Sequence, residues 1–214
     1  MEVEAKFAIT GELDPALIDS LDTRPYTFSA AGVEKHVDTL LDTPDLRIIG
    51  QMHALRIRAA NSTLTLTLKG PNTGKGGIHK RQEWEAPLDP PLRLESDSWP
   101  EPIASRVIAL SGGASLLPLL HLNVERRRWV IQRDERAIGE LALDTGVILA
   151  AGRREPIHEL ELELKGAGAR ADLDALCALL TARLPLAPEA RSKLQRGLAL
   201  LRHALQEPDD APPA

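Results

Sequence analysis

The stretch HELELELKG, residues 158–166, places Glu159, Glu161, Glu163 and Lys165 at alternate positions, with a leucine at each position between them. Successive side chains of a β-strand point to opposite faces of a sheet, so this period of two predicts a strand with one charged face and one leucine face. The leucine face has to pack against a core. The charged face needs an explanation of its own.

The first residues of the chain, MEVEAKFAI, repeat this pattern, because Glu2, Glu4 and Lys6 fall on one face of the predicted strand and apolar residues fall on the other. Three further segments sort their side chains in the same way: Arg56 and Arg58 in ALRIR, Thr65, Thr67 and Lys69 in LTLTLK, and Arg81, Glu83 and Glu85 in RQEWE. Carboxylates and cations are therefore largely segregated, and like charges crowd together within single strands.

Period-two alternation is frequent along the chain, whereas helical periodicity is confined to a few segments. Eight strands are predicted, at Glu2–Ile9, Lys35–Asp42, Ala54–Ala59, Thr63–Lys69, Ile78–Ala86, Leu122–Gln132, Ile138–Asp144 and Ile157–Lys165. Helices are predicted at Asp14–Leu21, Glu101–Leu110, Ala169–Leu184 and Pro188–Leu205. Short antiparallel strands favour a sandwich or a closed barrel, and eight strands suit closure around a modest interior. We expect one domain over residues 1–206 and a disordered tail over 207–214.

Composition limits the function classes. The 214 residues carry a net charge of -5, which gives no general basic surface, so no nucleic-acid partner is expected. The single cysteine, Cys177, excludes an internal disulfide and fits an apolar helix position. The first residues lack the features of a secretory signal, and no apolar stretch is long enough to span a bilayer. We therefore expect a cytoplasmic protein with no membrane partner, and the sequence leaves both a monomer and a homodimer open.

The charged faces have two interpretations. One is an ordinary sheet with a wet outer face, whose cross-strand ion pairs each contribute only about 0.2 to 1 kcal/mol. The other follows from the segregation of charge, because crowded carboxylates repel unless a cation lies between them and crowded arginines suit an anion. Mg2+ and Mn2+ prefer oxygen ligands, and guanidinium groups match phosphate oxygens. A divalent metal together with a polyphosphate would satisfy both sets, in an interior that stays wet.

At this point the residues resemble a known family. The pattern E-x-E-x-K at Glu2, Glu4 and Lys6 is similar to the signature of the CYTH superfamily, the triphosphate tunnel metalloenzymes. The resemblance continues in order through LLDTPDLRIIGQMHALRIR, LTLTLKGP, RQEWE, LALDTG and HELELELKG. Members of this family fold as an eight-stranded antiparallel barrel whose tunnel binds triphosphate and divalent metal. The resemblance therefore implies an α+β fold, a closed eight-stranded antiparallel β-barrel with helices packed outside.

The resemblance also implies an activity. The segment ARSKLQRGLALL is similar to the closing helix of bacterial inorganic triphosphatases, so the implied reaction is hydrolysis of the terminal phosphoanhydride of tripolyphosphate with Mg2+ or Mn2+. The substrate would be a small-molecule polyphosphate. Three alternatives stay open: an adenylate cyclase of the same family, a thiamine or nucleoside triphosphatase, and a polyphosphate-binding module without catalysis.

Site residues follow from the same resemblance. The implied metal ligands are Glu2, Glu4, Glu159, Glu161, Glu163 and Asp144, with Glu83 and Glu85 orienting them. The implied phosphate-binding residues are Lys6, Arg56, Arg58, Lys69, Arg81, Arg126, Arg128, Lys165 and Lys193, with Arg196 as a further candidate. Lys6 and Glu4 are the implied catalytic residues, and Lys6 is expected to assist proton transfer. In NVERRRWVI, Arg126 and Arg128 share a face and are assigned to the tunnel, whereas a slipped register would turn Arg127 inward.

Other signals favour structural roles. GPNTGKGG, residues 70–77, lacks the spacing of a phosphate-binding P-loop and predicts a hairpin loop. The six histidines show no metal-ligand spacing, so surface or packing roles are expected for them. Trp84, Trp99 and Trp129 are expected to pack between sheet and helices. Leu40 and Leu41 stand where the family often has aromatic residues, which alters packing and no ligand.

Overall fold

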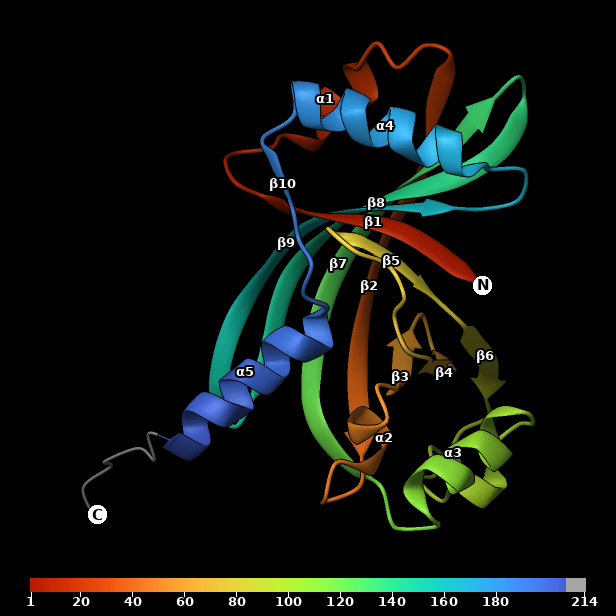
Figure 1. Cartoon of the computed structure of the whole chain (residues 1–214), viewed down its shortest axis with the longest axis vertical. Helices are drawn as coiled ribbons and strands as arrows, with labels where there is room; N and C mark the ends of the chain where they lie inside the picture. The colour runs from red at the N-terminus through yellow and green to blue at the C-terminus, as the bar shows by residue number, and fades with distance from the viewer. Residues whose placement is uncertain (207–214) are drawn as a thin grey trace.

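The computed structural model describes residues 1–206, so the tail predicted at 207–214 lies outside the described residues. Its ten strands form one antiparallel sheet (Figure 1). They are β1 (Glu2–Ile9), β2 (Tyr26–Asp42), β3 (Ala54–Ala60), β4 (Thr63–Lys69), β5 (Ile78–Arg81), β6 (Glu83–Leu88), β7 (Leu117–Arg133), β8 (Arg136–Ala150), β9 (Arg153–Leu164) and β10 (Leu186–Pro188). The strand order is β10-β1-β9-β8-β7-β2-β3-β4-β6, and β5 pairs with β1.

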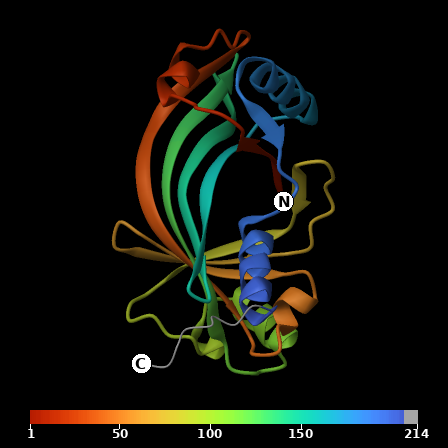
Figure 2. The same ribbon diagram turned by 90° about the vertical axis from the view of Figure 1, so that its left-hand side faces the viewer.

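The strand at the far end of this order leads back to β1. β6 pairs with β4 and β5 pairs with β1, and Gln82 alone separates β5 from β6. When β5 and β6 are counted as one interrupted strand and the three-residue β10 is set aside, eight strands surround the interior. The long strands β2, β7, β8 and β9 curve around it (Figure 2). The observed architecture confirms the predicted α+β class built on antiparallel strands.

Two predicted strands have the predicted bounds, Glu2–Ile9 and Thr63–Lys69. The strand predicted at Ile78–Ala86 is interrupted at Gln82, and β2, β7 and β8 extend well beyond their predicted ends. The first half of β2 contains the small residues of SAAG, which carry little alternation. It becomes a strand because it pairs with the end of β7, across a register shift between Ala30 and Gly32.

The leucine face of β9 lies in the largest core, on the outer side of the sheet. Leu160 and Leu162 are fully buried there and pack with Leu173, Leu176 and Leu180 of α4 (Arg170–Arg183). The short helix α1 (Pro15–Ser20) joins the same core through Ile18 and lies beside α4 in Figure 1. Trp129 is fully buried in this core, and Cys177 packs at its edge, as predicted for both residues.

A second core covers the outer side of β3 and β4. Here α2 (Arg47–Gly50) and α3 (Ile103–Ser111) pack on the strands through Ile48, Ile103 and Val107, all three fully buried. A single turn of 3-10 helix, Ser96–Ser98, leads towards α3. Trp99 is buried in this core and Trp84 packs against it, so both have the predicted packing role. Because α1 to α4 all cover outer faces, the inner face of the sheet is left to the charged residues.

The last helix, α5 (Lys193–Gln206), is placed differently. Its apolar residues Leu194, Leu200 and Leu201 pack on a third core that includes Leu122 and Val124. Leu122, Val124 and Leu194 also line the interior cavity, so α5 covers the inner side of the sheet at one end. None of the described helices is both long and apolar enough to cross a membrane.

The DTPD segment, residues 42–45, has a structural role. Asp42 is fully buried, and its Oδ1 accepts hydrogen bonds from the backbone N–H groups of Thr43 and Ile48, at 2.7 and 2.9 Å. Its Oδ2 accepts from the N–H of Ile49 at 2.8 Å. Asp42 thereby supplies acceptors to the first N–H groups of α2, which have no partner within the helix. This side chain does not line the cavity.

Replacing Asp42 with asparagine should destabilise the chain by about 1 to 3 kcal/mol, because an amide NH2 would face a buried backbone N–H group. Urea unfolding measures this loss. Asp45→Asn is the matched control, since Asp45 belongs to the same segment but is exposed, and it should cost less than about 1 kcal/mol. Equal losses for the two variants would contradict the capping role.

Candidate functional site

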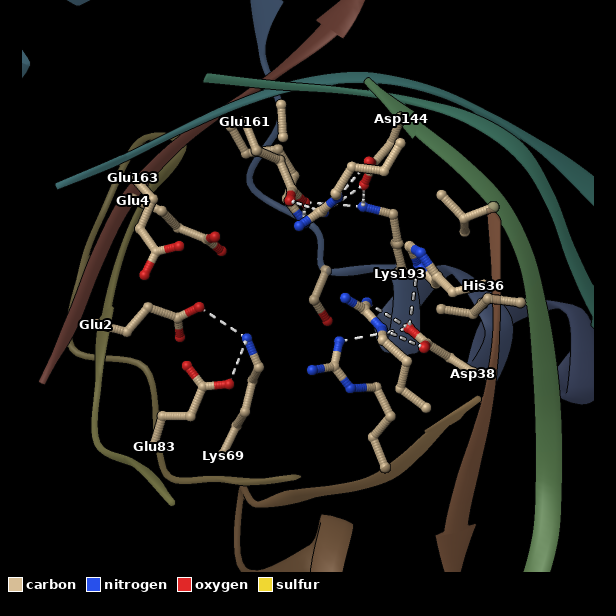
Figure 3. Close-up of a pocket in the computed structure, with 18 of the residues that line it drawn as sticks. Glu2, Glu4, His36, Asp38, Lys69, Glu83, Asp144, Glu161, Glu163 and Lys193 are labelled. Atoms are coloured by element: carbon tan, nitrogen blue, oxygen red, sulfur yellow. Dashed lines mark hydrogen bonds and ion pairs between the residues drawn. The ribbon is translucent and has the colours of Figure 1, made fainter. Parts of the chain in front are cut away.

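The charged faces of the strands meet around a cavity of about 370 Å³ inside the sheet (Figure 3). Among the described residues, the lining includes ten carboxylates and nine Lys or Arg side chains. The carboxylates are Glu2, Glu4, Glu34, Asp38, Glu83, Glu85, Glu140, Asp144, Glu161 and Glu163. The cations are Lys6, Arg56, Arg58, Lys69, Arg81, Arg126, Arg128, Lys165 and Lys193. A volume at the lower end of the range for ligand pockets suits a compact ligand.

The structure brings nearly all the predicted site residues to this cavity. Of the eighteen candidates, Glu159 and Arg196 do not line it, and both are buried. Arg126 and Arg128 line the cavity, and Arg127 between them is exposed. Sequence reasoning missed Glu34, His36, Asp38, Glu140 and Ser192. The alternation of Glu34, His36 and Asp38 in VEKHVD was a usable signal, because residues two apart on a strand share a face.

One group of charges surrounds the start of α5. The Nζ atom of Lys193 donates hydrogen bonds to Glu159 at 2.9 Å and to Glu161 at 2.8 Å, and it lies 2.9 Å from Oδ2 of Asp144. Arg126 donates to both oxygens of Asp144, at 2.7 and 2.6 Å, and to Glu161 at 2.6 Å. Burial opposes ionisation of Glu161, but the charges of Lys193 and Arg126 hold its pKa well below the usual value. The pKa of Lys193 is raised against its burial, by Asp144 first.

Glu159 is surrounded by cations rather than open to the cavity. Arg196 of α5 donates to it, Lys193 bonds to its Oε2, and Nζ of Lys6 lies 3.6 Å from the same oxygen. Arg196 also donates to Glu155 at 2.6 Å, and it does not line the cavity. Arg196 and Glu159 therefore form a buried ion pair that fixes α5 to β9.

A second group lies on β1 and its neighbours. Glu2 accepts hydrogen bonds from Nζ of Lys69 at 2.7 Å and from Nε of Arg81 at 2.6 Å. Burial opposes ionisation of Glu2, but Lys69 and Arg81 bring its pKa to about 2. Arg81 also donates to Glu4 at 3.1 Å, and Lys69 lies 3.3 Å from Glu83.

The negative charges of Glu4 and Glu163 are not fully compensated by nearby cations. They are direct partners in the β1–β9 register, and Figure 3 shows both carboxylates on the same side of the cavity as Glu2. Burial, and then repulsion from Glu161, raises the pKa of Glu4. Burial also raises the pKa of Glu163, and the negative charges of Glu2 and Glu4 add to that rise against the opposing effect of Lys165. A bound cation would relieve this repulsion.

The third group is rich in guanidinium. Asp38 accepts two hydrogen bonds from Arg58, at 2.7 and 2.9 Å, and a longer one from Arg56 at 3.4 Å. Within residues 1–206, the buried Nε atoms of Arg56 and Arg128 have no hydrogen-bond acceptor. Burial lowers the pKa of Arg56, and the nearby charge of Arg58 lowers it further. An anion placed among these groups would supply the missing acceptors.

The donor set suits a hard divalent cation, although the side chains are not arranged around one. Glu2, Glu4 and Glu163 offer carboxylate oxygens, the ligands that Mg2+ and Mn2+ prefer. Among the described residues, no group of three or more acidic, histidine or cysteine side chains has the spacing of a formed metal site. Ion pairs within the cavity hold several of these carboxylates, so a metal would have to compete with Lys69 and Arg81 for Glu2.

Comparison with known proteins identifies relatives of the whole chain. Residues 1–198 match the CYTH domain family. An inorganic triphosphatase of Haemophilus influenzae is 28% identical over 204 residues, which cover 93% of this chain and 54% of that protein. The chain thus spans about half the length of this curated relative.

Solved structures show the same fold. A candidate adenylyl cyclase from Hippeastrum, described as having a dominant triphosphatase activity, superposes with a TM-score of 0.65 at 22% identity, covering 95% of this chain and 96% of that one. A candidate adenylate cyclase from Bacillus halodurans gives a TM-score of 0.62 at 22% identity, covering 92% and 96%. At these identities the likeness concerns the fold.

Proposed function

This chain belongs to the CYTH domain family, and from that premise we propose that its cavity binds linear polyphosphate with Mg2+ or Mn2+ and hydrolyses the terminal phosphoanhydride of inorganic triphosphate. The observation that most supports this proposal is the near balance of ten carboxylates and nine cations around one cavity. A polyanion entering alone would leave a large excess of buried negative charge, which is costly. Divalent cations entering with it would restore the balance.

The phosphate oxygens would be held by the cations that line the cavity. Lys69 and Arg81 come from β4 and β5, Arg56 and Arg58 from β3, and Arg126, Arg128 and Lys193 from β7 and α5 (Figure 3 shows Lys69 and Lys193). Lys6 and Lys165 complete the set. The orphaned Nε atoms of Arg56 and Arg128 support this role, since buried donors without acceptors are rare. Guanidinium groups on several sides would orient the phosphate chain, and such positioning carries much of the catalysis of phosphoryl transfer.

The proposed metal ligands are narrower than the set implied by the sequence. Glu2, Glu4 and Glu163 would hold the cation, with Glu161 and Asp144 as further ligands and Glu83 and Glu85 orienting them. Glu159 is proposed to position Lys193 and Arg196 instead, because cations already surround it. A divalent cation bound by Glu2, Glu4 and Glu163 would neutralise phosphate charge and polarise a water molecule.

Two side chains would then handle protons. Glu4 is buried and lines the cavity, so a carboxylate oxygen that does not hold the cation would be placed to take a proton from the attacking water. Lys6 is also buried, with Nζ 3.4 Å from Glu161. Its ammonium would donate a hydrogen bond to the leaving phosphate and stabilise the charge that develops there.

The purified chain should release phosphate from tripolyphosphate when Mg2+ or Mn2+ is added, and should lose that activity in excess chelator. A substrate panel separates the alternatives: cyclic AMP from ATP would indicate a cyclase, and faster turnover of thiamine or nucleoside triphosphates would indicate a different triphosphatase. Calorimetry that shows tight binding of tripolyphosphate without turnover would leave only a binding module. The substrate would be a small cytoplasmic molecule, and its hydrolysis would require neither nucleic acid nor membrane.

A further inference from the structure

His36 is a cavity residue with an unused hydrogen-bonding atom. It lies on β2 between Glu34 and Asp38, it lines the cavity, and its side chain is only 1% exposed (Figure 3). Within the described part of the chain, its Nδ1 atom has no hydrogen-bond partner. The closest acidic oxygens lie 3.8 Å from Nδ1, on Glu34, and 3.9 Å from Nε2, on Asp38. Both distances are too long for a hydrogen bond.

Charged groups from five elements face this imidazole. They are Glu34 and Asp38 of β2, Arg58 of β3, Arg126 of β7, Asp144 of β8 and Lys193 of α5. Burial is the main effect on His36, and together with the charge of Arg58 it lowers the pKa to about 4 in spite of Asp38. Without a bound anion the imidazole is therefore neutral at neutral pH, although it lies between two carboxylates.

We propose that His36 is a further substrate-binding residue, which donates a hydrogen bond to a phosphate oxygen and takes up one proton from solvent as polyphosphate binds. This inference rests on the proposed function, because it needs a polyanion in the cavity. A neutral imidazole has one N–H donor and one free nitrogen, and protonation of the free nitrogen makes both nitrogens donors. Glu34 or Asp38 could then accept from one nitrogen while phosphate accepts from the other.

Binding changes the charges that keep the imidazole neutral. Phosphate oxygens that pair with Arg58 and Arg126 cancel the positive charges nearest to His36, and the remaining phosphate charge favours an imidazolium. In this structure both carboxylate oxygens of Asp38 accept hydrogen bonds from Arg58. If Arg58 turns towards phosphate, Asp38 is released next to Nε2 of His36. Both changes act in the same direction, so polyphosphate binding and protonation of His36 should favour each other.

A purely structural histidine explains the geometry less well. A buried donor or acceptor without a partner is destabilising, and an apolar residue at this position would avoid that cost. The imidazole lines a cavity rich in cations, which is where an anionic ligand would supply a further hydrogen-bond partner.

The test uses tripolyphosphate and the full chain in chelator, so that no turnover occurs. Isothermal titration calorimetry in buffers of different ionisation enthalpy gives the number of protons taken up on binding. At about pH 6, His36→Gln should take up about one proton fewer than the wild type, since its amide can donate but cannot be protonated. His36→Leu should also bind about tenfold more weakly, because it has no donor. His121→Gln, on the exposed face of β7, is the control and should match the wild type.

Histidine NMR of the wild type supplies a readout that needs no variant to fold. The imidazole of His36 should titrate near pH 4 without ligand, and should titrate at clearly higher pH with tripolyphosphate bound. Suppose that tripolyphosphate binds, that His36→Gln takes up as many protons as the wild type, and that the pH at which His36 titrates does not rise. The inference is then wrong while the proposed function stands. If tripolyphosphate does not bind in chelator but is hydrolysed once Mg2+ is added, the inference is wrong while the proposed function stands. If it neither binds in chelator nor is hydrolysed with Mg2+, both fall together.

Discussion

Glu4→Gln should reduce the rate of tripolyphosphate hydrolysis by about a thousandfold or more, because it removes one metal-binding carboxylate and the proposed proton acceptor together. The shape of the side chain is nearly unchanged, and the glutamine oxygen can still accept the hydrogen bond that Arg81 now donates to Glu4. A steady-state phosphate-release assay at saturating metal measures the loss. Glu12→Gln is the control, since Glu12 is exposed and does not line the cavity.

The same substitution should stabilise the metal-free chain at neutral pH, which separates a lost function from a lost fold. The pKa of Glu4 is higher in the folded chain than its ordinary value, so its favourable contribution is complete at low pH and is lost as pH rises through the folded pKa. Glutamine has no such loss. We expect melting a few degrees higher than wild type at neutral pH, and a smaller difference in acid. An active variant, or a destabilised inactive one, would contradict the role given to Glu4.

The sequence predicted the inner face of the cavity well, and the reason is local. In HELELELKG and MEVEAKFAI the contrast between the two faces of each strand is nearly complete, so the direction of every side chain follows from the pleat alone. The observed burial of Leu160 and Leu162 against α4 shows which face became the core. Once that face is fixed, Glu161 and Glu163 have to point inward.

The parts that sequence reasoning missed depend on contacts between distant segments. Nothing in SAAG predicts a strand, and its pairing with the end of β7 decides its conformation. His36 and Asp38 are an exception, because their alternation with Glu34 was a usable signal. The apolar Leu40 at the end of the same inner face made this strand look less charged than β1 or β9. The separation of Glu159 from the cavity could not be read from its strand, because Arg196 comes from a helix about forty residues later.

Lys193→Ala is expected to have the largest effect on stability. The Nζ atom of Lys193 lies within 2.9 Å of oxygens from three buried carboxylates, those of Asp144, Glu159 and Glu161. Removing one partner of a buried ion pair leaves uncompensated charge and typically costs about 3 to 5 kcal/mol. Lys165→Ala is the matched control, because Lys165 pairs with Glu163 at 2.6 Å but is half exposed. Its loss should cost less than about 1 kcal/mol in the same urea titration.

The pH dependence and the response to metal follow from the same geometry. The pKa of Asp144 and that of Glu161 are both lowered in the folded chain, so their contribution to stability is present above the ordinary carboxylate pKa and is lost as pH falls through the folded values. The difference between wild type and Lys193→Ala should therefore narrow below about pH 4. At neutral pH, Mn2+ should restore part of the lost stability, because the freed carboxylates can bind it. If Mn2+ stabilises the variant no more than the wild type, the carboxylates around Lys193 are not available to metal, and the ligand set is confined to Glu2, Glu4 and Glu163.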